Sequence, residues 1–462
     1  MRYILSEHIA LRSWRLVPYA YYVKGQQFAR GLREEEFRFL LGCDGESEQE
    51  PSAPAEALLE RGLIRPAEPG ETLTDWQRYL ACDNRYMPQM NLQLTARCNY
   101  NCLHCFNAVD NAPLHAQFGF EELTKLLDEA RDCGIHALLL TGGEPLLHPQ
   151  FAQIVRAIYA RGMYVFELNT NGYFLTQTLL DELNAIGCRP LMKISFDGLG
   201  THDWMRGHEG AEADALRAIR LCVENGFRVK VQYNVNRKNL PRLRETLTLL
   251  DSMGVEHIRL IPTTNAPRWE KNAPNASLSR EEYLALALDT AAWYARCEHH
   301  AELESWLVCS LLPQRRAYRL ESVSLTNDRY RDTLPLCKGI RGMIAVGANG
   351  QVYPCLQMSG WFDEHGIDLG NVKREGLQKL LQGSAYLDCV CQTVRERKEK
   401  NGKCGACPYL RHCRGGCPAL AILGSETGDI LAPDPLRCAF YEGGWYERFV
   451  DALEGYKNLT VM

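Results

Sequence analysis

A regular alternation of apolar strands and amphipathic helices in the middle of the chain constrains its fold more than any other feature. The expected strands are residues 91–95, 137–140, 164–168, 191–195, 228–235 and 257–261, and the expected helices are residues 120–132, 150–161, 176–186, 211–225 and 239–253. A glycine stands where the C-terminal cap of each helix belongs, at Gly134, Gly162, Gly187, Gly226 and Gly254. This order predicts an α/β fold with parallel strands joined by crossover helices.

Three cysteines lie in a short loop after the first expected strand. Cys98, Cys102 and Cys105 have the spacing CxxxCxxC. Three thiolates leave one iron of a four-iron cluster open to another ligand, and a zinc knuckle is the alternative for the motif taken alone. The motif closely resembles the signature of the radical S-adenosylmethionine (SAM) enzymes. That resemblance implies a partial (β/α)₆ barrel in which SAM chelates the open iron and the chemistry gathers at the carboxyl ends of the strands.

The ends of the next three strands carry further residues similar to those of that family. Thr141-Gly-Gly-Glu-Pro145 resembles the GGEP turn that grips the SAM amino group, because glycines permit a close approach and Glu144 can accept from an ammonium. The resemblance implies SAM contacts at Gly142, Gly143, Glu144, Asn169, Ser195, Asp197 and Arg206. Arg206 would pair with the methionine carboxylate, or else be a solvated loop arginine. We expect His104 to flank the cofactor as a flat ring, not to bind metal.

Seven more cysteines form a specific pattern in the last third of the chain. Cys404, Cys407, Cys413 and Cys417 form CxxCx₅Cx₃C, with Cys337, Cys355 and Cys438 around it. The pattern closely resembles the SPASM extension, which holds two auxiliary iron–sulfur clusters; seven thiols do not divide into whole tetrathiolate zinc sites. The resemblance implies an outer cluster on Cys404, Cys407, Cys413 and Cys438 and an inner one on Cys337, Cys355 and Cys417. The inner cluster then has an open iron, or Cys389, Cys391 or Cys309 completes it.

The remaining cysteines need no cofactor to explain them. Of the 19 cysteines in the chain, those outside the motifs are Cys43, Cys82, Cys133, Cys188, Cys222, Cys297, Cys309, Cys389 and Cys391. We expect most of these to be buried small apolar residues or inert thiols. The basic run from Arg395 to Lys403 is expected to be a solvated helix face.

The N-terminal residues form a separate predicted unit. Short strands over residues 3–5, 10–14 and 19–23, helices over 34–41 and 55–61, and a polar loop from Gly45 to Ala55 suggest a small winged-helix unit. Residues 1–83 hold 10 Lys and Arg against 14 Asp and Glu, the wrong sign for phosphate contacts. Ahead of a radical SAM core, the unit resembles the recognition elements of peptide-modifying enzymes, which hold a leader peptide at a sheet edge. A plain structural cap on the barrel is the alternative.

Composition excludes several classes of protein. A net charge of −5 over 462 residues argues against a nucleic-acid-coating protein, and no signal peptide or membrane span is evident. We therefore expect a cytoplasmic protein without nucleic-acid or membrane partners. The expected units are residues 1–83, 84–300 and 301–462, the last being the SPASM domain.

The expected activity follows from the two resemblances. A radical SAM/SPASM peptide maturase would cleave SAM with electrons from a flavodoxin or ferredoxin and abstract hydrogen from a precursor peptide, forming a thioether or carbon–carbon cross-link. Alternatives are a sulfatase-maturing enzyme, although Leu356 stands where that family has an acidic residue, an enzyme of a small metabolite, and an iron–sulfur electron carrier or redox sensor. No general acid or base is evident.

Overall fold

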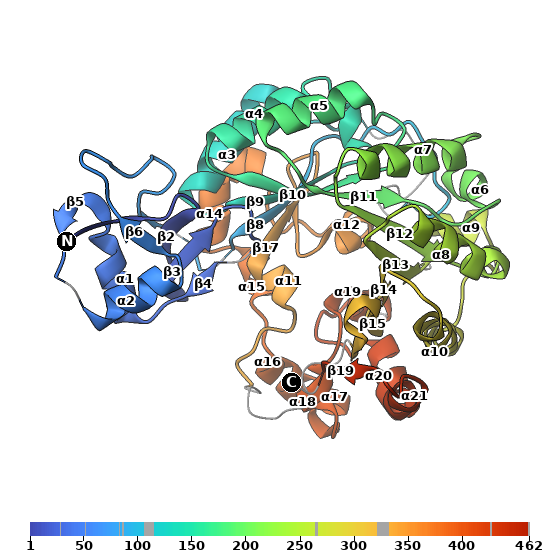
Figure 1. Cartoon of the computed structure of the whole chain (residues 1–462). Helices are drawn as coiled ribbons and strands as arrows, with labels where there is room; N and C mark the ends of the chain where they lie inside the picture. Colours follow the sequence, from blue (N-terminus) through green and yellow to red (C-terminus); the bar gives the residue numbers. More distant parts are fainter. Residues whose placement is uncertain are drawn as a thin grey trace.

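The centre of the protein is a parallel sheet bent into an arch (Figure 1). The computed structural model describes residues 1–460 apart from residues 28, 51, 83, 86, 106–114, 264–266, 321–331 and 426. Helices cover the outer side of the arch, and parts of the C-terminal segment, including α12 (Ser359–Glu364) and α19 (Pro418–Leu423), lie at its open side. This arrangement confirms the predicted α/β class and partial barrel.

All six predicted strands are present and parallel. They are β8 (Gln89–Gln93), β9 (Ala137–Thr141), β10 (Tyr164–Thr170), β11 (Leu191–Ser195), β12 (Val229–Val235) and β13 (His257–Pro262). The crossover helices are α3 (Phe120–Asp132), α4 (Phe151–Ala160), α5 (Gln177–Ile186), α7 (Ala211–Glu224) and α8 (Leu243–Ser252). The five predicted cap glycines have φ between +69° and +81°. This is the left-handed region in which many helices end, and glycine adopts it without the steric cost that a Cβ would bring.

The sheet is longer than the alternation predicts. β14 (Glu302–Ser305) adds in parallel to β13, and β17 (Met343–Val346) adds in parallel to β8. Each is only four residues long and lies beyond the alternating region, so no periodic signal marks it. Four more strands extend the two edges: β15 (Cys309–Leu312), β16 (Ala317–Leu320) and β19 (Lys457–Asn458) beyond β14, and β18 (Val352–Tyr353) beyond β17. The sheet therefore continues past residue 300.

The N-terminal unit lies beside the arch and contains two small sheets (Figure 1). The predicted elements appear as β1 (Arg2–Leu5), β2 (Ile9–Trp14), β3 (Val17–Val23), α1 (Glu34–Leu41) and α2 (Ala53–Glu60), with β4 (Arg30–Gly31), β6 (Ile64–Pro66) and β7 (Leu80–Ala81) completing the sheets. The predicted loop from Gly45 is wrong at its start, because β5 (Asp44–Glu48) pairs antiparallel with β1. β5 is an edge strand with mostly exposed side chains, so its acidic composition is tolerated there.

Short helices make up the rest of the chain. They are α6 (His202–Arg206), α9 (Pro267–Asn272), the longer α10 (Arg280–Arg296), α11 (Lys338–Gly342), α13 (Val372–Glu375), α14 (Leu377–Gln382), α15 (Ala385–Val390), α16 (Val394–Lys400), α17 (Gly402–Ala406), α18 (Leu410–Cys413), α20 (Pro435–Glu442) and α21 (Trp445–Ala452). One apolar core runs from the outer face of the sheet into the C-terminal segment. Within the described part of the chain, no helix has the length and apolar character needed to cross a bilayer.

Candidate functional site

The loop that carries the first three cysteines is held by helix α6. The backbone N–H groups of Asn101 and Leu103 donate to the carbonyls of Arg206 (3.2 Å) and Met205 (2.9 Å). A Cβ at Gly207 would lie 2.5 Å from the Asn101 carbonyl oxygen, so only glycine permits this approach. Desolvation, together with the nearby Cys102, Glu144 and Cys105, raises the pKa of the Cys98 thiol to about 12. The three thiols are thus near enough to influence one another electrostatically, and a multi-iron cluster with a cationic core would relieve the repulsion between their thiolates.

The GGE turn is packed against the backbone that leads into this loop. The N–H groups of Gly143 and Glu144 donate to the carbonyls of Thr95 and Arg97, at 2.7 and 2.8 Å. A Cβ at Gly142 would lie 2.4 Å from the Thr95 oxygen, and one at Gly143 would lie 2.3 Å from the Arg97 oxygen. The two glycines therefore have an immediate role that the sequence does not reveal: they let strand β9's turn approach the cysteine loop.

Glu144 is buried and hydrogen-bonded to the end of strand β10. Its Oε1 accepts from the Thr170 hydroxyl (2.8 Å) and its Oε2 from the Asn171 N–H (2.8 Å). Burial raises the pKa of this carboxyl to about 7, although these donors oppose the shift. Because an opposite charge favours the ionised form, a ligand ammonium would lower this pKa. Asn171 also donates to Asn99 Oδ1 (2.8 Å), which joins the strand end to the cysteine loop.

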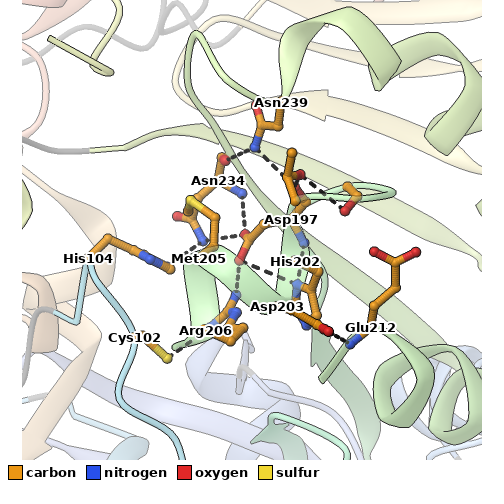
Figure 2. Close-up of polar contacts among 12 residues, drawn as sticks. Cys102, His104, Asp197, His202, Asp203, Met205, Arg206, Glu212, Asn234 and Asn239 are labelled. Atoms are coloured by element: carbon orange, nitrogen blue, oxygen red, sulfur yellow. Dashed lines mark hydrogen bonds and ion pairs between the residues drawn. The ribbon is translucent and has the colours of Figure 1, made fainter. Parts of the chain in front are cut away.

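Asp197 and Arg206 form a buried ion pair at the end of strand β11, next to a cysteine of the loop (Figure 2). Nη2 of Arg206 lies 2.7 Å from Asp197 Oδ2, and its Nη1 lies 3.8 Å from Cys102 Sγ. Burial alone would raise the pKa of Asp197, but the guanidinium holds it well below its usual range. Each terminal nitrogen of Arg206 thus has one protein contact, and Nε has no hydrogen-bond partner among the described residues, so the guanidinium keeps N–H donors for a ligand carboxylate.

Asn234, at the end of strand β12, completes this cluster, and the motif search missed it. Its N–H and side-chain amide both donate to Asp197 Oδ1, at 2.9 and 3.1 Å, and its Nδ2 lies 3.2 Å from His104 Nε2 (Figure 2). Burial lowers the pKa of His104 to about 4, so this imidazole is neutral. The sequence signal of Asn234 is weak, because it is one of several polar residues in and after the fifth predicted strand and belongs to no motif. Arg268 was missed for a similar reason; it donates to the Asn101 side chain from helix α9.

Several buried polar atoms around the arch have no hydrogen-bond partner within the described residues. They include Asn169 Oδ1, Asn91 Oδ1, Asn99 Nδ2 and His104 Nδ1. Buried polar atoms are normally satisfied, so such a group marks the place of a polar ligand. Ser195 lies half-buried on the same strand ends. The residues that the sequence assigned to SAM therefore gather in one place and fit a polar, zwitterionic cofactor.

The C-terminal cysteines form two groups. Cys404, Cys407, Cys413 and Cys438 line one small pocket with Asp434 and Arg437. Cys337, Cys355 and Cys417 form the other; burial raises the pKa of Cys355 to about 11 and of Cys417 to about 12, and neighbouring thiols of the group add to both shifts. Asp434 connects the groups, because its Oδ2 accepts from the Cys417 N–H at 2.8 Å. Each group offers three or four thiols, the donor set of an iron–sulfur cluster.

The basic run beside the first group is not entirely solvated, which corrects the sequence prediction for residues 395–403. Arg397 is fully buried, and its guanidinium donates to the carbonyls of Arg414 (3.2 Å) and Ile430 (2.6 Å). Burial lowers its pKa, whereas the nearby Cys404 and Cys413 raise it. The guanidinium thus lies behind the wall of the four-cysteine pocket, packed against the lining residue Gly415.

Most of the cysteines outside the motifs are buried, as the sequence predicted, and three are not. Cys43, Cys82, Cys133, Cys188, Cys222 and Cys309 are buried, and Cys297 is exposed. Cys389 and Cys391 are half-buried and lie, like Cys355, near the Tyr386 hydroxyl. Among the residues that the structure describes, no group of three or more His, Cys, Asp or Glu side chains is close enough to hold a single metal ion.

Known proteins share both cysteine-bearing regions of the chain. Residues 92–269 match the Radical SAM superfamily, and residues 337–408 match the SPASM iron–sulfur cluster-binding domain. An AdoMet-dependent heme synthase of Methanosarcina barkeri is 27% identical over 361 residues, covering 76% of this chain and 96% of the synthase. A PqqA peptide cyclase of Granulibacter bethesdensis is 24% identical over 354 residues, covering 75% of this chain and 87% of the cyclase.

A solved structure matches nearly the whole fold. Streptococcus suis SuiB bound to the precursor peptide SuiA superposes with a TM-score of 0.62 at 13% identity, covering 93% of this chain and 99% of SuiB. Residues 1–83 are about 18% of the chain. Since only 7% of the chain is left uncovered, the match must extend into the N-terminal unit.

Proposed function

The chain is a radical SAM enzyme that carries a SPASM iron–sulfur domain, and from this premise we propose that it modifies a precursor peptide. The observation that supports the proposal is the match to SuiB bound to the precursor peptide SuiA, which covers 93% of this chain and therefore part of the N-terminal unit. Residues 1–83 would hold the leader of that peptide at a sheet edge. Residues 84–300 and 301–462 are the proposed barrel and SPASM units, although β14 and β17 of the latter extend the barrel sheet.

The radical SAM domain binds SAM and a 4Fe–4S cluster, and the SPASM domain binds auxiliary iron–sulfur clusters. When bound, SAM and its cluster supply one-electron cleavage of a sulfonium and removal of a hydrogen atom from an unactivated C–H bond. Cys98, Cys102 and Cys105 are the proposed cluster ligands. Glu144 would bind the SAM ammonium, and Asn169 and Ser195 would bind its polar groups with Gly142 and Gly143 in the adjacent turn.

The protein's own polar residues keep this site in one arrangement. The Asp197–Arg206 pair and Asn234 fix α6 against the cysteine loop, so the three thiols cannot spread. Arg206 presents a positive charge to Cys102, with Nη1 at 3.8 Å from its Sγ. The proposed outer cluster ligands are Cys404, Cys407, Cys413 and Cys438, and the inner ones are Cys337, Cys355 and Cys417. Cys389 or Cys391, which like Cys355 lie near Tyr386, would complete the inner set if its fourth iron is not open.

A second candidate substrate is a tetrapyrrole. It is favoured by one observation, the 27% identity to a heme synthase, which exceeds the 24% identity to the peptide cyclase. The synthase aligns over 76% of this chain, so about a quarter of the chain has no counterpart in it. The peptide cyclase leaves nearly the same share of the chain unmatched, so coverage does not separate these two relatives. We place the peptide first because the solved structure that is bound to a precursor peptide covers 93% of this chain. We further propose a cytoplasmic enzyme supplied with electrons by a flavodoxin or ferredoxin.

The test uses anaerobically reconstituted full-length protein. With dithionite and SAM it should release 5′-deoxyadenosine, and with the short open reading frames adjacent to its gene it should change the mass of one encoded peptide. A mass change in an iron porphyrin substrate, with none in any such peptide, would replace the peptide proposal by the tetrapyrrole one.

A further inference from the structure

The inner face of the arch is charged, which is unusual for a barrel. Parallel pairing places Lys193, Lys230 and His257 on one row across β11, β12 and β13, and Gln232, Arg259 and Glu304 on the next row. Their sequence neighbours, such as Ile194, Val231, Ile258 and Leu303, belong to the apolar core under the helices. Because successive side chains alternate between faces, the charged rows point away from those helices, into the arch. Interiors of parallel barrels are normally packed with branched apolar side chains.

The charges on these rows do not balance. Glu167 pairs with Lys193 at 3.2 Å. One atom of Glu304 faces the other three basic groups: its Oε2 accepts from Arg259 Nε at 2.7 Å and from Lys230 Nζ at 3.2 Å, and it lies 2.9 Å from His257 Nε2. Within these ion pairs two carboxylates face the cations Lys193, Lys230 and Arg259, so one positive charge is left over even with His257 neutral. Glu302, on the row of His257, is exposed and belongs to none of these pairs.

Arg259 is the cation of this network that has solvent-accessible N–H donors to spare. Its guanidinium is held by Nε, while Nη1 and Nη2 have no hydrogen-bond partner among the described residues. Its side chain remains 27% exposed, against 6% for Lys230 and 9% for Glu304. A guanidinium anchored through Nε presents the two terminal nitrogens as a fork, the geometry that binds a carboxylate with two hydrogen bonds.

A purely structural role does not explain this network. Buried ion pairs recover little more than their desolvation cost, and apolar replacements often stabilise a protein. An unbalanced network is costlier still. The rows also lie close to the SPASM domain, because the Lys193 ammonium is near enough to lower the pKa of Cys355, which burial otherwise raises. At one point the rows include Ser195, a predicted SAM residue on the row of Gln232 and Arg259, and at another Lys193 lies near the inner cysteine group.

We propose that Arg259, supported by Glu304, Lys230 and His257, is a subsite that binds a carboxylate of the substrate inside the arch. The inference rests on the proposed function and deepens it, since it names the chemical class that the substrate presents to the barrel. An acidic side chain of a peptide and a propionate of a tetrapyrrole offer the same group. Arg259 is then a binding residue, and Glu304 orients it.

The experiment compares the reconstituted wild type with Arg259→Gln, Arg259→Lys and the matched control Arg244→Gln, which removes an exposed arginine paired with Asp289 on the outer face. Two probes are used: coproporphyrin III against its methyl ester, followed by fluorescence quenching, and a displayed pool of random peptides, followed by sequencing of the bound fraction. Iron content per chain and circular dichroism establish that each variant is folded.

We expect Arg259→Gln to weaken the carboxylate-dependent binding about 10- to 100-fold, Arg259→Lys to weaken it less, and Arg244→Gln to leave it unchanged. Enrichment of Asp and Glu in the wild-type peptide pool, lost in Arg259→Gln, assigns the carboxylate to a peptide; ester-sensitive porphyrin binding assigns it to a propionate. Equal binding of acid and ester together with no acidic enrichment, or full binding by Arg259→Gln, overturns the subsite. Failure of the wild type to release 5′-deoxyadenosine from SAM would instead refute the proposed function, and this assay needs no substrate.

Discussion

Removing the cation from the buried Asp197–Arg206 pair should destabilise the protein strongly. Asp197 is fully buried, and Arg206 is its 2.7 Å partner. In Arg206→Met, Asp197 keeps two hydrogen bonds from Asn234 but loses its neutralising charge. Breaking a buried ion pair on one side costs about 3–5 kcal/mol. We expect a loss of that order in the free energy of unfolding of the cluster-free chain, measured by urea titration with tryptophan fluorescence.

The loss in free energy of unfolding caused by Arg206→Met should be larger at neutral pH than at acidic pH. In the wild type the pKa of Asp197 is held well below its unfolded value, so the pair stabilises fully above about pH 4 and less as the pH falls through the folded pKa. In Arg206→Met, burial acts without the cation and raises this pKa, so protonation relieves the buried charge on acidification. The difference between the two proteins should therefore be widest near pH 7 and narrow toward pH 4.

A double-mutant cycle separates the free energy that couples Asp197 to Arg206 from any general destabilisation of α6. Asp197→Asn leaves Arg206 charged and alone, whereas the double variant Arg206→Met/Asp197→Asn buries no charge at either position. The double variant should be less destabilised than the sum of the single ones by about 2 kcal/mol. Additive effects, or a pH-independent loss in Arg206→Met, would refute the reasoning.

The remaining predictions concern the cysteine groups and the N-terminal unit. Cys102→Ala should abolish 5′-deoxyadenosine release in the dithionite assay, while Cys297→Ala, at an exposed cysteine outside all groups, should leave it unchanged; retained activity in Cys102→Ala would mean that the first cluster is misassigned. Reconstituted protein should bind about 12 iron atoms per chain, from three four-iron clusters, and a value near four would remove the auxiliary sites. Arg397→Met should lower that count by about four by opening the walls of the Cys404 group, whereas the exposed-face variant Lys400→Met should not; equal counts would deny Arg397 this role. Deletion of residues 1–83 should weaken peptide binding measured by calorimetry and spare peptide-independent SAM cleavage, and unchanged affinity would dismiss leader docking.

Much of the arch could be predicted because its signals are local. Glycines such as Gly187 end helices through their own backbone conformation, and each strand of the alternation is long enough to show its apolar character. β14, β17 and β5 escaped prediction because short or acidic strands form only when a neighbour supplies hydrogen bonds. These strands therefore depend on tertiary contacts, which no local sequence pattern reveals.

The candidate site likewise combines residues in short sequence motifs, which could be predicted, with residues brought in by long-range packing, which could not. Cysteine motifs and the GGE turn are short patterns, so the residues that gather around the arch could be named in advance. Arg206 was expected near a carboxylate, and the structure places it on Asp197 and Cys102 because α6 folds back over the loop. Asn234, Arg259 and the buried Arg397 lie in segments without a motif, and only the packing of distant strands and helices brings them to their partners.

The most direct test of the account is electron paramagnetic resonance of anaerobically reconstituted, dithionite-reduced protein before and after SAM is added. In a Cys404→Ala/Cys355→Ala background that simplifies the auxiliary signals, the account predicts a reduced four-iron signal whose g values shift when SAM occupies the iron left open by Cys98, Cys102 and Cys105. Metal analysis that finds only zinc, or an iron signal that SAM leaves unchanged, would contradict it.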